Sequence, residues 1–123
     1  MKYLILIYSN PKSREIWEGF SDAQRAEGWR DHFALVEELT ESGEMVVSEG
    51  LADPSQARRV TVHDGSAVTS DGPFAESKEY LAGFFLIECE SIDHAIEHAA
   101  RIPEAALGLV EVRPVLASNG LEM

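Results

Sequence analysis

The chain has 123 residues, of which 45% are hydrophobic and 26% are charged, a composition typical of one globular domain with a single core. Its 22 acidic and 10 basic residues give a net charge of −12, which repels phosphate groups and argues against a nucleic-acid partner. The single cysteine, Cys89, excludes an internal disulfide, and the first apolar run, residues 3–8, is far shorter than a membrane span. We therefore expect one cytoplasmic domain over residues 1–123 that binds neither membranes nor nucleic acids.

The N-terminal part predicts a strand followed by a long helix. Residues 2–8 form an apolar, β-branched and aromatic run of strand length. A segment that we interpret as a polar loop follows. Ser21 and Gln24 then have the spacing of a capping box, and apolar residues recur at intervals of three and four until Gly43. This pattern predicts a helix over residues 22–41.

The middle of the chain predicts short strands separated by turns. Strand-forming residues with alternating character occupy residues 44–50 and 59–63. The dipeptide Asp64-Gly65 is a typical two-residue hairpin turn, and it joins the second of these strands to residues 66–69. We therefore expect a β-hairpin at this point.

The C-terminal part predicts a long strand, a second helix and a last strand. The long strand covers residues 80–89, and Gly83 within it indicates a bulge or the close approach of another backbone. Ser91 caps a helix that ends at Pro103, and residues 109–115 return as an alternating strand. The expected buried stripe of this helix consists of Ile92, Ala95, Ile96, Ala99 and Ile102.

The order of these elements predicts the fold class. The arrangement β-α-β-β-β-α-β, with helices in long crossovers, indicates an α+β ferredoxin-like sandwich with an antiparallel sheet and both helices on one face. The other face of the sheet then needs cover, which a second copy of this small chain would provide by stacking sheet against sheet. We therefore expect a homodimer, with a small-molecule pocket between sheet and helices or at the dimer seam.

The sequence lacks the familiar nucleotide, serine-hydrolase and zinc motifs, and we expect no organic cofactor and no metal. His94 and His98 have a spacing that can chelate a metal, but they lie with Arg101 opposite the predicted buried stripe, so we interpret them as solvated surface. Cys89 is interpreted as a small buried hydrophobe and His63 as a residue that flanks a turn.

His32 is the strongest candidate for a functional histidine. It follows Trp29 by three residues and precedes Val36 by four, which places it at the edge of the apolar face of the predicted helix. Gly28, one turn earlier, leaves a gap that a ligand or a close strand would fill. Two interpretations stay open: a core histidine bound to a backbone carbonyl, or a side chain that binds ligand or transfers protons.

A second candidate region is the charged segment 71–79, which precedes the long apolar strand. Pro73 stiffens the turn, so Asp71 and Phe74 are expected to project from a fixed corner, as the wall of a pocket requires. The alternative is an ordinary polar loop anchored by Phe74. Lys78 in this segment and Arg113 are the cations available to an anionic group, although an ion pair with Glu111 is the simpler account of Arg113.

The string DGPFAESKEYLAGFFLIE at residues 71–88, the following helix from Ser91 and the closing strand 110–115 resemble the DGPF branch of the YCII-related proteins. The resemblance covers nearly the whole chain and implies a ferredoxin-like dimer of the α/β-barrel type. In that wider family a His/Asp pair has been proposed as an active site, and one relative is linked to dehydrochlorination of a chlorinated hydroxyquinone. The histidine maps onto His32 and the aspartate onto Asp71, whereas the adjacent Asp31 points about 100° away on a helix.

Two hypotheses of function follow. The favoured one is a cofactor-independent acid/base enzyme for a small polar or aromatic molecule, with His32 as proton carrier and Asp71 as its carboxylate partner, a role that Glu76 or Glu79 could also take. The alternative is a non-catalytic dimeric protein that binds a metabolite or acts as an accessory or regulatory subunit. The expected substrate-binding residues are Gly28, Trp29, Phe74, Glu76, Lys78 and Arg113.

Overall fold

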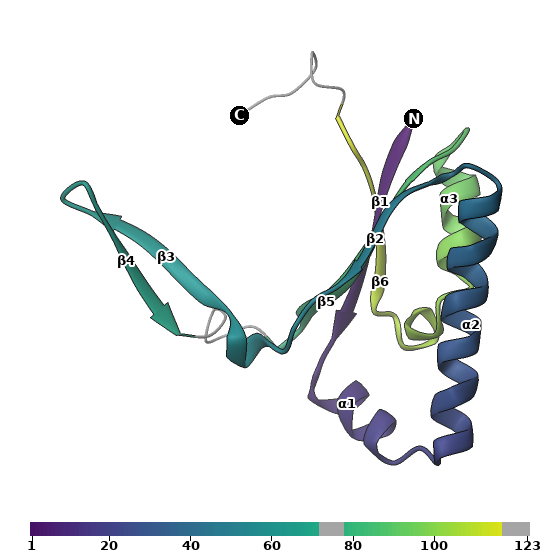
Figure 1. Cartoon of the computed structure of the whole chain (residues 1–123), viewed down its shortest axis with the longest axis horizontal. Coiled ribbons are helices and arrows are strands. Elements are labelled where there is room, and N and C mark those ends of the chain that lie inside the picture. Colours follow the sequence, from purple (N-terminus) through teal and green to yellow (C-terminus); the bar gives the residue numbers. More distant parts are fainter. Residues whose placement is uncertain (72–77, 117–123) are drawn as a thin grey trace.

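A four-stranded sheet lies at the centre of the computed structural model, which describes residues 1–71 and 78–116 (Figure 1). Helices α2 and α3 cover one face of this sheet, and a two-stranded hairpin projects from the other side. The elements in chain order are β1 (Lys2–Ser9), α1 (Pro11–Glu18), α2 (Asp22–Glu41), β2 (Met45–Gly50), the 3-10 helix η1 (Pro54–Gln56), β3 (Arg58–His63), β4 (Ser66–Asp71), β5 (Tyr80–Glu88), α3 (Ile92–Ala99), the 3-10 helix η2 (Pro103–Leu107) and β6 (Val110–Pro114).

The strands of the main sheet have the order β2-β5-β1-β6, and each neighbouring pair is antiparallel. Ile5 at the middle of β1 pairs with Phe85 on β5 and with Val112 on β6. This order, together with helices on one face, confirms the predicted α+β class with an antiparallel sheet and is consistent with a ferredoxin-like arrangement. Among the described residues, no helix combines the length and the apolar character needed to cross a membrane.

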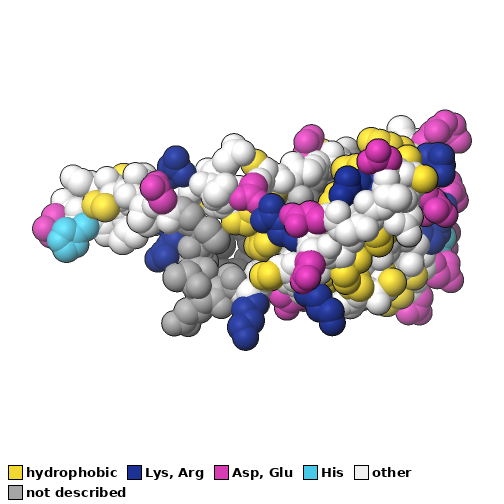
Figure 2. Space-filling view, turned by 90° about the horizontal axis from the view of Figure 1, so that it is seen from below, with side chains coloured by type: hydrophobic (Ala, Val, Ile, Leu, Met, Phe, Trp, Pro, Cys, Tyr) yellow, Lys and Arg dark blue, Asp and Glu magenta, His cyan; other side chains and the backbone are white. Residues whose placement is uncertain are grey.

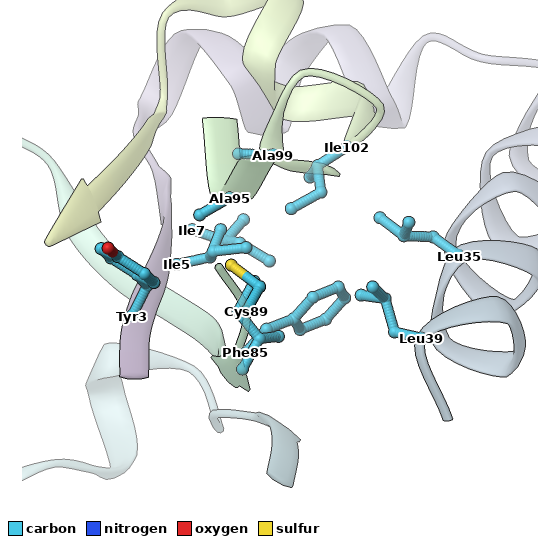
Figure 3. Packing of buried hydrophobic residues seen from close by; sticks show 11 residues of the cluster. Tyr3, Ile5, Ile7, Leu35, Leu39, Phe85, Cys89, Ala95, Ala99 and Ile102 are labelled. Carbon is cyan, nitrogen blue, oxygen red and sulfur yellow. The ribbon is translucent and has the colours of Figure 1, made fainter. Parts of the chain in front are cut away.

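The core lies between the sheet and the helices, as Figure 3 shows. Alternate residues of β1 point toward the helices, because successive side chains of a strand face opposite sides. From α2, Leu35 and Leu39 point toward Phe85 of β5, and all three are almost fully buried. Burial of side chains of this size stabilises a fold by about 1.5–3 kcal/mol each. The larger cluster comprises Tyr3, Ile5, Ile7, Leu35, Leu39, Phe85, Ile87, Cys89, Ala95, Ala99 and Ile102.

The predicted hairpin is confirmed as a separate two-stranded sheet of β3 and β4. Asp64 and Gly65 at its tip have positive φ angles of 50° and 79°, as a tight hairpin turn of this kind requires. Every residue of both strands is exposed, including three valines. The hairpin therefore extends away from the body of the molecule (Figure 2).

Two local predictions differ from the structure. The segment interpreted as a polar loop contains α1, which begins at Pro11 because the Asn10 side chain accepts a hydrogen bond from the Ser13 N–H at 2.8 Å. The predicted stripe of α3 is wrong in part, since Ile92 and Ile96 are exposed. Helix α3 instead packs through its small residues, Ala95 and Ala99, together with Ile102, because small side chains let the helix approach the sheet closely.

The predicted irregularity at Gly83 is confirmed. The register between β1 and β5 shifts next to the Ile7–Gly83 pair, and a Cβ atom on Gly83 would lie 2.9 Å from the backbone oxygen of Glu49. Strand β2 therefore approaches β5 closely at this point, and only glycine fits without a backbone shift.

We expect Gly83→Ala to lower the free energy of unfolding by about 1–3 kcal/mol, because the added methyl group must displace the Glu49 carbonyl of the neighbouring strand. Gly50→Ala is the matched control, since Gly50 pairs with Gly83 but a Cβ atom there meets nothing within 4 Å. Urea unfolding of both variants measures the difference, and equal effects would contradict the close approach.

Candidate functional site

His32 lies on α2, one turn before the buried Leu35, and its side chain is half-buried above the sheet. The helix begins where predicted, because Ser21 and Gln24 form the reciprocal hydrogen bonds of a capping box. The imidazole ring contacts the ring of Phe85 on β5, with centroids 5.6 Å apart. The core packing of α2 therefore fixes the position of His32.

Aromatic side chains surround His32 on its outer side. We call the set of Trp17, Phe20, Trp29, His32 and Phe33 the aromatic surface. Trp29 and Phe33 stack with centroids 5.8 Å apart, and the His32 ring is edge-on to both. Trp29 and Phe33 are 51% and 60% exposed, which is unusual for side chains of this size. These faces are available to a flat apolar ligand next to the imidazole.

The described contacts of His32 are ring contacts with Trp29, Phe33 and Phe85. Within residues 1–71 and 78–116, neither ring nitrogen of His32 forms a hydrogen bond. The described contacts therefore do not support a core histidine held by a backbone carbonyl. An imidazole without such a partner keeps both nitrogens available to a ligand.

The gap above Gly28 has a different occupant from the one expected. The sequence predicted a ligand or a strand, but the indole of Trp17 fills the gap, and its nearest atom lies 3.5 Å from the position of a Cβ on Gly28. Trp17 comes from α1, the helix that the sequence analysis missed. Gly28 therefore lets α1 dock against α2, where Trp17 also meets Trp29 edge to face.

The predicted carboxylate partner lies elsewhere in the chain. Asp71 ends β4 and pairs with Arg58 on β3 at 3.4 Å, and Figure 1 shows this hairpin on the side of the sheet away from α2. Phe74 and Glu76 lie outside the described residues. Asp31 is exposed on α2. The described contacts therefore do not join His32 to a carboxylate within one chain.

Arg113, one of the two predicted cations, lies on the face of the sheet opposite to His32. Arg113 forms the expected ion pair with Glu111 at 3.0 Å, and the Tyr8 hydroxyl donates a 3.4 Å hydrogen bond to the same carboxylate. Burial and the Glu111 charge raise the pKa of Tyr8. Strand pairing places Glu111 and Arg113 opposite residues of β1 on the sheet face turned away from the helices, and Lys78 is exposed just before β5.

A cleft that the sequence analysis did not identify lies where the loop between β2 and β3 meets the start of β5. This cleft of about 330 Å³ includes Asp53 and Tyr80. Asp53 forms a 2.9 Å ion pair with Arg14 of α1 and accepts a hydrogen bond from the Ser55 N–H. Hydrogen bonds from Ser55, followed by the Arg14 charge, lower the pKa of Asp53. Two segments far apart in the sequence, residues 51–57 and residues 80–81, form this cleft, so no local sequence pattern could have revealed it.

Comparisons with known proteins now identify the family. A model of the YCII-related domain matches residues 1–119, and the chain therefore belongs to the YCII-related family. It is 32% identical over 117 residues to the uncharacterized protein R00369 of Rhizobium meliloti (strain 1021), with 94% of this chain and 92% of that protein covered. The predicted family is confirmed.

A solved structure has a similar fold. This is 5-chloro-2-hydroxyhydroquinone dehydrochlorinase (TftG) from Burkholderia phenoliruptrix AC1100 in complex with 2,5-dihydroxybenzoquinone. The TM-score is 0.53 at 18% sequence identity, and the match covers 97% of each chain. At 18% sequence identity, this structural similarity shows that the two proteins share the α+β fold.

Substitutions at Gly28 test the docking of α1. Gly28→Ala should stabilise the protein by up to about 1 kcal/mol, since alanine favours a helix and its methyl group would only touch Trp17. Gly28→Leu should displace the Trp17 indole, lower the melting temperature and change tryptophan fluorescence. Thermal unfolding measures the changes in stability and melting temperature. The Trp17→Phe variant shows whether the fluorescence change comes from Trp17. Unchanged fluorescence and melting in Gly28→Leu would contradict this packing.

Proposed function

We propose that this YCII-related protein is a dimeric acid/base enzyme in which His32 moves a proton on a small, oxygen-bearing aromatic or quinone-like molecule. The observation that carries this proposal is the half-buried His32 imidazole, which has no hydrogen-bond partner in the described chain and lies beside the exposed faces of Trp29 and Phe33. A flat ligand against these faces would place its polar edge near a proton carrier.

A histidine alone can transfer protons to and from such a ligand, because this reaction requires no redox group. A hydroxyquinone is a vinylogous acid, in which the ring carbon between an enolate oxygen and a carbonyl can take up a proton to give a keto form. The π electron pair forms the new C–H bond, and loss of a proton from the same carbon restores the enolate. An imidazole can donate the first proton and accept the second near neutral pH.

The fold relative supports this choice of ligand class. The dehydrochlorinase TftG is described in complex with 2,5-dihydroxybenzoquinone and shares the fold over 97% of both chains. Its ligand is planar and carries oxygen atoms around the ring, the features that the aromatic surface and His32 would recognise. We therefore use this compound as the first probe.

Asp71 stays the predicted carboxylate partner of His32. A carboxylate in contact with one imidazole nitrogen would fix the tautomer and favour the protonated ring. Asp71 pairs with Arg58 on the hairpin, on the side of the sheet away from α2. The His32–Asp71 contact therefore requires a movement of the hairpin or the hairpin of a second copy.

The open face of the sheet supports a homodimer. Leu4 and Leu86 pair directly across β1 and β5, as do Leu6 and Phe84, and these pairs alternate with the residues that face the helices. No described helix covers this side of the sheet (Figure 1). The hairpin projects on the same side and exposes Val60, Val62 and Val68. Leu6 is already buried, but stacking with a second copy would remove the half-buried Leu4, Phe84 and Leu86 and the three valines from water.

We expect light scattering to give a mass of twice 13.6 kDa for the wild type at micromolar concentration. Phe84→Lys should shift the protein toward the monomer, because it places a charge in the proposed interface. Ile96→Lys is the matched control, since Ile96 is 48% exposed on the outer side of α3. A monomeric wild type, or a dimer that survives Phe84→Lys, would exclude the stacked sheets.

The role of His32 is tested with 2,5-dihydroxybenzoquinone, whose ring C–H groups exchange with D2O through the keto form. The wild type should bind the probe and accelerate this exchange, measured by calorimetry and by NMR. His32→Gln should retain binding within a few-fold but lose about 10²-fold or more of the acceleration, the usual contribution of an acid/base group.

His63→Gln is the control for the exchange experiment, because His63 is exposed on the hairpin and should leave both quantities unchanged. Trp29→Leu should weaken binding of the probe, since it removes one face of the aromatic surface. Binding without accelerated exchange in the wild type would contradict the enzyme and favour the non-catalytic ligand-binding alternative. Full exchange activity in His32→Gln would remove His32 from the mechanism.

A further inference from the structure

Glu44, His94 and His98 form a cluster between the end of α2 and the outer side of α3. Oε2 of Glu44 lies 3.0 Å from Nε2 of His98 and 3.2 Å from Nε2 of His94. The His98 side chain is only 12% exposed and that of His94 41%. The prediction that both histidines are solvated surface is therefore wrong for His98, because the actual rotation of α3 turns it inward.

The backbone holds the Glu44 carboxylate in place. The Glu44 N–H donates to the Leu39 carbonyl at 3.0 Å, and its carbonyl accepts from the Glu88 N–H at 2.8 Å, which ties the turn after α2 to β5. The Ser42 hydroxyl donates to Oε1 of Glu44 at 2.9 Å. This leaves Oε2, the other carboxylate oxygen, directed at the two histidines.

The donor atoms have the spacing of a metal site. One ligand atom from each of Glu44, His94 and His98 lies within 4.8 Å of the others. Neighbouring ligand atoms of a tetrahedral zinc ion with bonds of about 2.0–2.1 Å are roughly 3.3 Å apart. The two N–O distances of 3.0 and 3.2 Å are already close to this value, so small side-chain rotations would open the cluster around an ion.

We propose that Glu44, His94 and His98 bind one divalent transition-metal ion of the zinc type. Two imidazole nitrogens and one carboxylate oxygen suit Zn²⁺ and Co²⁺ better than Mg²⁺ or Ca²⁺, which prefer oxygen ligands alone. Three protein ligands leave a fourth position free. Glu44 and His94 also line an open cleft of about 570 Å³, through which an ion and a fourth ligand can reach the site.

The charges around the cluster favour a cation. Glu88 and Glu90 line the same cleft, and Glu97 lies 3.6 Å from the other ring nitrogen of His94, the position of a carboxylate that orients a metal-bound histidine. Of the cations near the cluster, Arg101 is engaged by Glu38 at 2.7 Å, and the ammonium group of Met1, which also lines the cleft, donates to the Cys89 carbonyl at 3.2 Å. Burial alone would raise the pKa of the Glu44 carboxyl, but hydrogen bonds from Ser42 and His98 outweigh it and lower that pKa.

The test uses the untagged full chain after treatment with a chelator. Zn²⁺ titration by calorimetry should give one ion per chain, and Co²⁺ should give the visible absorption of a four-coordinate site. His94→Gln and His98→Gln should each weaken binding on the order of 100-fold, because each removes a direct ligand. Glu97→Gln should weaken it by about 10-fold, as expected for a group that only orients His94.

His63→Gln is the matched control, since His63 is exposed on the hairpin and should leave Zn²⁺ binding unchanged. Zn²⁺ should raise the melting temperature of the wild type and of this control but not of His94→Gln, because the ion links α3 to the turn before β2. His94 is the more exposed ligand, so its variant keeps the test valid if His98→Gln fails to fold. Absence of saturable binding, or binding that persists in His94→Gln, would overturn the proposal.

Discussion

The packing of Leu35 and Leu39 of α2 against Phe85 of β5 is the contact on which the rest of the structure depends. These side chains are almost completely buried, and they join the longest helix to a central strand of the sheet. Because a helix is rigid, fixing Leu35 and Leu39 also fixes the residues one turn earlier and later. His32 thereby rests on the Phe85 ring, and the turn that carries Glu44 is placed beside α3.

Because the helices cover only one face of the sheet, the opposite face is accessible to another molecule. The covered face forms the core, whereas the opposite face presents the half-buried Leu4, Phe84 and Leu86, and the hairpin extends on that side. An isolated two-stranded ribbon has little stability in water, because it has no sheet or helix to pack against. A second copy would cover the open face of the sheet and also give the hairpin a surface to pack against. Because Asp71 lies on this hairpin, its position relative to His32 depends on how two copies assemble.

The close packing of α3 shows how small side chains can create a polar site. Ala95 and Ala99 let this helix lie directly on the sheet, and the resulting rotation exposes Ile92 and Ile96. The same rotation turns His98 inward to meet Glu44, whose carboxylate also accepts a hydrogen bond from Ser42 and lies 3.2 Å from His94. An apolar stripe of isoleucines facing the sheet would have left both histidines in water.

The sequence by itself determined the features that depend on neighbouring residues or on a simple period. These are the start of α2 from its capping box and its end before Gly43, the hairpin turn at Asp64 and Gly65, and the close approach at Gly83. It also placed His32 at the edge of the buried face of α2. Only the tertiary structure decided that Trp17 fills the gap at Gly28, that α3 packs through its alanines and that Glu44 meets His94 and His98. The sequence period shows that a helix has an apolar face, but it does not fix how far the helix is rotated about its axis when it packs on the sheet. Contacts between distant segments depend on this packing, so the sequence alone does not determine them.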